Sequence, residues 1–199
     1  MNHDAADAFV PDRGVLYSLG LHPWHLNPDT VSAQIQRCAA HGIDPQVVAI
    51  GECGLDRIKG APLAVQLAAF ESQIQLAEQL QKPLIIHAVR AYSDILSLVK
   101  RFHPARAWLL HGYTGNVRTT EQLLKHEVYF SLGEPALRRA KLCDLEAVPT
   151  ERLFLETDTA NVSIAEIYSR AANVLKIPVY ELAAKLAGNF ELLFNYTAK

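Results

Sequence analysis

Short apolar runs alternate along this chain with longer stretches whose apolar residues recur at helical spacing, and this alternation limits the folds open to it. Strand and helix in repeated alternation are typical of a parallel sheet with helical crossovers. No glycine-rich phosphate loop follows the first run, so we predict for this α/β chain a closed TIM-like (β/α) barrel rather than an open doubly wound sheet. The expected strands lie at residues 15–21, 46–51, 83–88, 107–112, 127–133 and 152–158, and the expected helices lie around 31–38, 63–77, 95–102, 123–124, 137–145, 164–171 and 180–194.

The size and charge of the chain set further bounds. Its 199 residues, half of them hydrophobic, suit a single domain over 1–199 with a substantial core. The formal net charge of -2 creates no overall attraction for nucleic acid or anionic membranes, so any attraction for nucleic acid must be local. No apolar run approaches the ~20 residues that span a bilayer, and the N-terminal residues lack the order of a signal peptide. Three widely spaced cysteines, Cys38, Cys53 and Cys143, indicate unpaired thiols, so we predict a cytoplasmic location and no membrane partner.

Four of the apolar runs end in side chains that can bind metal ions: Glu52, His87, His111 and Asp158. In a barrel the C-terminal ends of the strands gather at one rim, so these side chains would meet although they are far apart in sequence. Two imidazoles and two carboxylates suit Zn²⁺ or Mn²⁺, and the carboxylates also admit Mg²⁺. Such an ion lowers the pKa of a bound water and polarises a phosphoryl or carbonyl oxygen.

Each of these four residues also has an ordinary interpretation. A histidine beside a strand is usually hydrogen-bonded within the core or at its rim, and an acid at a strand end often caps the next helix. Taken singly, each residue fits that interpretation better. Four such residues at matching positions on four strands favour a shared site, with coincidence as the alternative.

Six segments, in order, resemble the TatD family of metal-dependent deoxyribonucleases, a branch of the amidohydrolase-like barrels. The resemblance covers nearly the whole chain from about Leu16, and six ordered motifs are more specific than any one of them. It implies a hydrolase with one or two divalent ions that acts on DNA, from a 3′ end and on single strands or frayed ends. The segments are "SLGLHPW" (18–24), "AIGECGLD" (49–56), "QIQLAEQLQKPLIIHAVRAYSDIL" (73–96), "LLHGYTGN" (109–116), "YFSLGE" (129–134) and "LFLETD" (153–158), and "GNFELLF" (188–194) fits the closing helix of the family.

By this resemblance Glu52 would be a metal ligand, bridging if two ions bind. His87 and His111 would complete the shell of the second ion with it. Asp158 would bind the first ion and would orient or deprotonate the attacking water. His22, in the segment "GLHP", would face the substrate phosphate, although a loop-capping role before Pro23 is an equal alternative.

Two further positions depart from the family pattern. Arg90 would take the phosphate-binding role of a basic residue that many relatives carry one position earlier. His25 lies outside the usual spacing because Trp24 intervenes, and it is expected to be secondary.

The N-terminus departs most. The family opens with a strand that ends in a histidine-x-histidine pair, whereas this chain begins "MNHDAADAFVPDRG". We therefore expect a barrel that is incomplete at the N-terminus, with the first strand missing and the second absent or reduced to a segment around residues 8–10. The sequence leaves open whether the chain is a fragment or alternative start or has lost part of the site. His3 would be a mobile surface residue. The uncovered sheet edge would need the N-terminal segment, a partner chain or a second copy of the protein to cover it.

Three functions stay open on the sequence. The first is a metal-dependent deoxyribonuclease of the TatD type. The second is a metallohydrolase that acts on another ester or an amide, since related barrels differ mainly in their loops. The third is a non-catalytic member of the family that serves in a complex, which the absent histidine pair favours.

Overall fold

Strands alternate with helices throughout the computed structural model, which describes residues 2–4, 9–139 and 145–196. This alternation confirms the predicted α/β class. The chain divides into two compact units, residues 1–108 and 109–199. The first unit contains β1 (Asn2–Asp4), β2 (Tyr17–Gly20), α1 (Val31–His41), β3 (Val47–Asp56), α2 (Leu63–Leu80), β4 (Leu84–Val89) and α3 (Tyr92–Phe102), and β5 (Trp108–Leu110) lies at the division.

The strands β1 to β4 of the first unit are parallel and neighbour one another in the order of the sequence. Their side chains form a core in which Leu19, Ile50, Leu84 and Ile86 are almost completely buried. Burial on both faces explains why these strands appear in the sequence as continuous apolar runs rather than as alternating ones.

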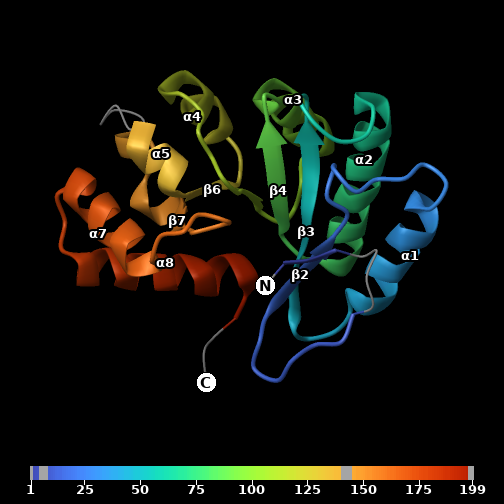
Figure 1. Ribbon diagram of the computed structural model, residues 1–199, viewed down its shortest axis with the longest axis horizontal. Helices are drawn as coiled ribbons and strands as arrows, with labels where there is room; N and C mark the ends of the chain where they lie inside the picture. Colours follow the sequence, from blue (N-terminus) through green and yellow to red (C-terminus); the bar gives the residue numbers. More distant parts are fainter. Residues whose placement is uncertain (1, 5–8, 140–144, 197–199) are drawn as a thin grey trace. The chain divides into compact units, whose positions relative to one another are not determined.

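The helices of the first unit follow the apolar pattern of the sequence. In α2, Phe70 and Ile74 lie one turn apart on the buried face, and this helix packs on β3. Helix α1 lies beside β2 and α2, as Figure 1 shows. It ends where predicted, because the Gly42 amide donates to the carbonyl oxygen of Cys38 and closes the last turn.

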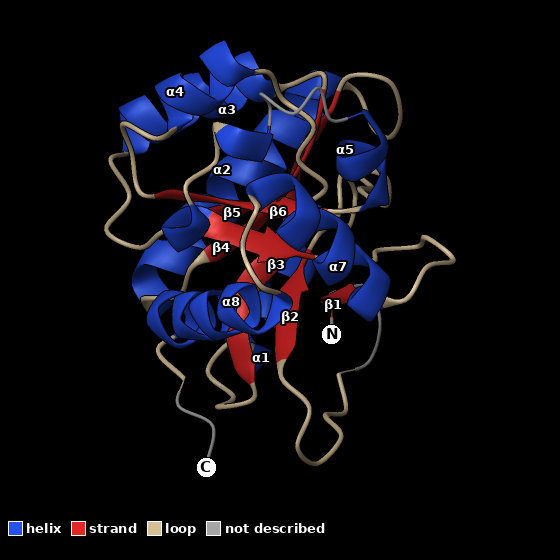
Figure 2. Cartoon of the chain, turned by 90° about the vertical axis from the view of Figure 1, so that its left-hand side faces the viewer, coloured by secondary structure: helices blue, strands red, loops and turns tan. Residues whose placement is uncertain are grey.

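The N-terminal segment differs from the prediction. Residues Asn2–Asp4 form β1, which pairs in parallel with Ser18–Gly20 of β2 and lies beside it in Figure 2. The expected strand at 8–10 is wrong for residues 9 and 10, which have no strand structure, and residue 8 lies outside the described residues, as do the side chain of His3 and the residue Cys143. A strand of polar residues gives no apolar run to detect in the sequence, and β1 is identified by its main-chain pairing with β2.

The second unit contains α4 (Val117–Leu123), β6 (Val128–Leu132), α5 (Glu134–Arg139), the 3-10 helix η1 (Thr150–Arg152), β7 (Leu153–Leu155), α7 (Ile164–Leu175) and α8 (Val179–Phe194). Strands β6 and β7 are parallel. Ser163 caps α7 as predicted, since its hydroxyl oxygen accepts from the Glu166 amide at 3.1 Å. Asn189 of α8 donates to the carbonyl oxygens of Thr150 and Leu153, at 2.7 and 2.8 Å, and so ties α8 to β7. Ala140, expected in the helix that begins at α5, lies outside the described residues.

Lys82 holds the loop between α1 and β3. Its half-buried ammonium group donates to the carbonyl oxygens of Gly42 and Val47, and to that of Asp44 at 3.3 Å. Burial lowers the pKa of Lys82 below its ordinary value, and the nearby Asp44 opposes this shift.

We expect Lys82→Met to lower the free energy of unfolding by about 1–3 kcal/mol, because it leaves three partly buried carbonyl groups without their donor. The matched control is Lys100→Met at the exposed end of α3, which should change stability by less than about 0.5 kcal/mol. Urea unfolding followed by circular dichroism measures both. Equal stabilities of the two variants would contradict the role given to Lys82.

Within the described part of the chain, no helix is both long and apolar enough to cross a bilayer. Cys38 and Cys53 are buried thiols outside any disulfide. Burial raises the pKa of Cys38 to about 12 and that of Cys53 well above its ordinary value.

Candidate metal centre

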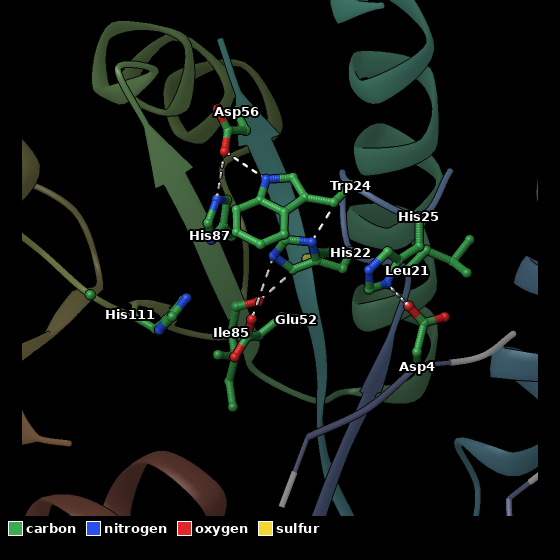
Figure 3. Close-up of polar contacts among 12 residues, drawn as sticks. Asp4, Leu21, His22, Trp24, His25, Glu52, Asp56, Ile85, His87 and His111 are labelled. Carbon is green, nitrogen blue, oxygen red and sulfur yellow. Dashed lines mark hydrogen bonds and ion pairs between the residues drawn. The ribbon is translucent and has the colours of Figure 1, made fainter. Parts of the chain in front are cut away.

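Three side chains of the first unit lie close enough together to be considered as a metal-binding group among the described residues. His22, Glu52 and His87 each present one nitrogen or oxygen atom, and these atoms all lie within 4.8 Å of one another. His22 follows β2, Glu52 lies in β3 and His87 lies in β4, so neighbouring parallel strands supply the cluster (Figure 3). Imidazole and carboxylate are donor types that bind divalent cations, but a ring nitrogen that faces the cation must carry no proton.

Glu52 lies at a β-bulge within β3 and not at the end of the strand. Ile50 pairs with Leu84 and Cys53 with Ile86, so β3 has one residue more than β4 between these pairs. Such a bulge re-aims a side chain and is frequent beside active sites. Gly51 permits it, since its φ is 141° and a Cβ there would lie 2.4 Å from the Ile85 carbonyl oxygen. The expectation that the strand stops at residue 51 is therefore wrong, because β3 continues to Asp56.

Asp56, at the end of β3, is a buried carboxylate with several donors. Its Oδ2 accepts from the Trp24 indole nitrogen at 2.7 Å, and its Oδ1 accepts from the Ile58 and Lys59 amides at 2.7 and 2.9 Å. Burial by itself would raise the pKa of Asp56, but the hydrogen bonds from Trp24, Ile58, Lys59 and His87 outweigh it and lower the pKa to about 2. Asp56 is therefore ionised at neutral pH and can only accept hydrogen bonds.

The carboxylate of Asp56 fixes the tautomer of His87. The Nε2 atom of His87 lies 3.2 Å from Asp56 Oδ2 and must carry the proton, because the carboxylate has none to donate. In the neutral ring the lone pair then resides on Nδ1, the atom that can coordinate a metal. A carboxylate that orients a metal-binding histidine in this way is a common outer partner of metal sites.

His22 has the opposite arrangement. Its Nδ1 accepts a hydrogen bond from the Trp24 amide at 3.2 Å, so the neutral ring carries its proton on Nε2. This Nε2 lies 3.7 Å from Glu52 Oε2. A ring whose Nε2 is protonated presents a donor beside the acid, which suits contact with an anionic oxygen better than contact with a cation.

The second unit pairs its histidine with an acid as well. Nδ1 of His111, directly after β5, lies 3.2 Å from Glu156 Oε1, which also accepts from the Gly112 amide at 2.8 Å. The Glu156 carboxylate thus accepts from Nδ1, and the lone pair of neutral His111 lies on Nε2. Asp158 follows in the turn after β7, exposed, with a left-handed φ of 43°.

The two remaining predicted residues lie at the surface of the first unit. Arg90 is exposed directly after β4 and has a left-handed φ of 52°. His25 is also exposed, and its Nδ1 lies 2.8 Å from Asp4 Oδ2, so its partner belongs to the N-terminal strand rather than to the metal cluster.

Asp56 also gives the fold a dependence on pH. Its pKa drops from an ordinary value of 3.8 to about 2 on folding, so its stabilisation is complete above about pH 4 and is lost as the pH falls towards 2. Relative to Asp56→Asn, we expect the unaltered chain to lose up to about 2 kcal/mol of unfolding free energy over this range. Urea unfolding at pH 5, 4 and 3 checks this. A constant difference between the two proteins would contradict it.

Sequence reasoning passed over Asp56, Glu156 and Trp24. Asp56 ends the quoted segment "AIGECGLD", where an acid after a buried run is the same signal that marked Glu52. Glu156 lies in "LFLETD", where the prediction chose Asp158, two residues later, as the metal ligand. Only the fold reveals that Trp24, in "LHPW", donates to an acid 32 residues away.

Strands that alternate with helices and carry acids and imidazoles near their ends are the arrangement found in the metal-dependent hydrolases built on an α/β barrel. The sequence model described as "TatD related DNase" matches residues 5–195. The chain therefore belongs to the TatD-related DNase family.

Individual relatives agree with this assignment. The chain is 30% identical over 204 residues to the "3'-5' ssDNA/RNA exonuclease TatD" of Citrobacter rodentium, covering 90% of this chain and 77% of that protein. It is 34% identical over 131 residues to the "Uncharacterized metal-dependent hydrolase YabD" of Bacillus subtilis, covering 63% of this chain and 50% of that protein. The chain thus spans only half the length of some of the relatives that it matches.

Among solved structures, the crystal structure of YjjV, a TatD homologue from Escherichia coli K12, matches with a TM-score of 0.82 at 25% identity. The match covers 92% of this chain and 77% of that one. This likeness confirms the predicted fold class, an α/β fold of the TIM-like barrel kind.

Proposed function

We propose that this chain is a metal-dependent phosphodiesterase that degrades single-stranded DNA or frayed DNA ends from the 3′ side. The observation that carries the proposal is that two imidazoles, His87 in β4 and His111 directly after β5, each lie against a carboxylate. His87 and His111 each place one ring nitrogen 3.2 Å from a carboxylate of their own unit, Asp56 or Glu156, and a carboxylate in this position is a common outer partner of a metal-binding histidine. The family membership and the nuclease names of the relatives support the choice of substrate.

The residues that would hold one or two divalent ions are Glu52, His87, His111 and Asp158. Mg²⁺, Mn²⁺ and Zn²⁺ all suit this mixture of oxygen and nitrogen ligands. When bound, such an ion supplies an acidic water and neutralises charge on the phosphate.

The remaining steps fall to the chain's own groups. Asp158 orients the attacking water and accepts its proton. The Nε2–H group of His22 donates to a phosphoryl oxygen, where negative charge grows as the water attacks phosphorus. Arg90 binds a phosphate further along the strand.

A single-stranded oligonucleotide labelled at its 5′ end tests the proposal. With Mn²⁺ or Mg²⁺ we expect products that shorten one nucleotide at a time from the 3′ end, and EDTA should stop the reaction. Bis(4-nitrophenyl) phosphate and 4-nitrophenyl acetate, assayed alongside, separate a phosphodiesterase from a carboxylic esterase.

Two outcomes would overturn the proposal. Cleavage of the acetate ester alone would indicate a metallohydrolase of another substrate class. Well under one equivalent of bound metal, with no cleavage after Mn²⁺ or Mg²⁺ is added, would indicate a non-catalytic member of a complex.

We further propose that a second copy of the chain or a partner protein covers the outer edge of β1, and that the protein works in the cytoplasm. Within the first unit, β1 is a three-residue strand that pairs with β2, and the main-chain groups of an edge strand can pair with another chain. The two buried thiols support a reducing compartment. Sedimentation at micromolar concentration should reveal a dimer, and a monomer at every concentration would remove self-association.

A further inference from the structure

An exposed tryptophan adjoins the candidate metal centre. Trp24 is 40% exposed, whereas the other tryptophan, Trp108, is 1% exposed. The indole ring meets the His22 ring edge-on with centroids 4.8 Å apart, and the His87 ring with centroids 5.5 Å apart. Figure 3 shows the indole between these histidines and Asp56. The exposed part of the indole therefore lies beside the candidate metal centre, where a substrate can reach it.

A lysine lies against the face of this ring. The Lys59 ammonium nitrogen is 3.5 Å from the centroid of Trp24, in the geometry of a cation–π contact. The backbone beneath Lys59 is held firmly, because the buried Gln66 side chain donates to the carbonyl oxygens of Asp56, Lys59 and Ala61. The side chain itself is long and exposed, so it can leave the ring while its backbone stays in place.

Lys59 differs from its basic neighbour in the same loop. The Arg57 guanidinium group is engaged by the Asp94 carboxylate through two hydrogen bonds of 2.8 Å. Among the residues that the structure describes, no carboxylate forms an ion pair with Lys59, so its charge can be used to bind an anion. The loop 56–63 also borders a hollow of about 420 Å³, which leaves room for a ligand beside it.

We propose that Trp24 and Lys59 form a nucleotide subsite, in which the indole stacks on a base of the substrate strand while the ammonium group pairs with a phosphate of that strand. An exposed aromatic ring next to a cation is the combination that binds single-stranded nucleic acid without regard to sequence, and here the base would displace Lys59 from the ring face. Because the indole contacts the His22 ring, a base stacked on it would lie next to the phosphate that accepts from His22 Nε2 in the proposed function. The inference rests on the proposed function, because it assigns a substrate subsite to the same reaction.

Two substitutions of Trp24 isolate the stacking surface. Trp24→Phe and Trp24→Leu both lose the indole N–H that Asp56 accepts, so both should slow hydrolysis of bis(4-nitrophenyl) phosphate equally. Only Trp24→Leu also loses the aromatic face. We therefore expect the KM for single-stranded oligothymidylate to be about tenfold higher in Trp24→Leu than in Trp24→Phe, with similar kcat.

Lys59→Met tests the cation separately. It should raise the KM for the oligonucleotide and reduce the slope of log KM against log salt concentration by about 0.7, the value for one phosphate contact on a single strand. Lys100→Met, on α3, is the control and should leave that slope unaltered.

Intrinsic fluorescence gives a readout that needs no catalysis. A phosphorothioate-linked thymidine octamer, added with Mg²⁺, should quench the emission of Trp24 and protect it from acrylamide. Trp24→Phe should remove this response and leave the emission of the buried Trp108.

The outcomes separate the two proposals. If the unaltered protein cleaves oligonucleotides but Trp24→Leu and Trp24→Phe share one KM, the subsite is wrong and the proposed function stands. If the protein cleaves no phosphodiester, the proposed function fails, and the octamer titration still decides whether Trp24 binds nucleotides. Unchanged Trp24 emission at a saturating octamer concentration would overturn the subsite in either case.

Discussion

Replacement of Glu52 by Gln should lower metal-dependent cleavage of single-stranded DNA by about three orders of magnitude or more. The substitution keeps the shape of the side chain at the β3 bulge but removes the negative charge that would face a divalent ion. A bound cation contributes several kcal/mol to the stabilisation of a transition state, and each 1.36 kcal/mol corresponds to a tenfold change in rate. The initial rate on the labelled oligonucleotide, with Mn²⁺ at saturation, measures the loss.

The comparison needs a charge-matched control and a check of folding. Glu121→Gln removes the same charge from an exposed position on α4 and should leave the rate within a factor of about two. Circular dichroism and thermal unfolding show whether the Glu52→Gln protein is intact. A folded Glu52→Gln protein that keeps more than a tenth of the parental rate would falsify the assignment of Glu52 to the metal.

Replacement of Asp56 by Asn should lower metal affinity, and with it the rate at limiting metal, by about 10- to 100-fold. The Asn amide has one oxygen acceptor where the carboxylate has two, so it cannot serve the Trp24 indole, the His87 ring and two backbone amides together. The His87 ring then loses the partner that fixes its tautomer, although its position in β4 is unchanged.

Metal titration by isothermal calorimetry distinguishes this role from simple loss of structure. Asp56→Asn should need more Mn²⁺ to reach half its maximal rate, and excess metal should restore part of that rate. Asp94→Asn is a matched control, because Asp94 also holds a basic partner, Arg57, on the surface of the same unit. An Asp56→Asn protein that binds Mn²⁺ as tightly as the parent would refute the orienting role.

The order of strands and helices could be predicted from the sequence because burial leaves a direct mark on it. The runs around Ile50 and Ile86 are apolar since both faces of β3 and β4 are covered, and the stripe that contains Phe70 and Ile74 follows the turn of α2. Glu52 and His87 could be singled out as candidate ligands for the same reason, because an ionisable group that interrupts a buried strand needs a partner.

The parts that could not be predicted depend on contacts between distant residues. The bulge that orients Glu52 arises from the pairing of β3 with β4, and no pattern in the local sequence predicts it. The different proton positions on His22 and His87 arise from one amide and one carboxylate that the fold brings to them. β1 has polar residues and is held by its neighbour, so its sequence resembles that of a loop.

The glycines of β3 have a consequence for any attempt to alter this protein. Gly54 stands opposite His87, and a Cβ there would lie 2.2 Å from the His87 carbonyl oxygen, while a Cβ at Gly51 would lie 2.4 Å from the Ile85 carbonyl oxygen. The spacing between acid and imidazole is thus set by bare main chain, with no side chain that could be trimmed or enlarged to tune it. Laboratory evolution should therefore leave positions 51 and 54 constant and accumulate its useful changes in the loop around Lys59.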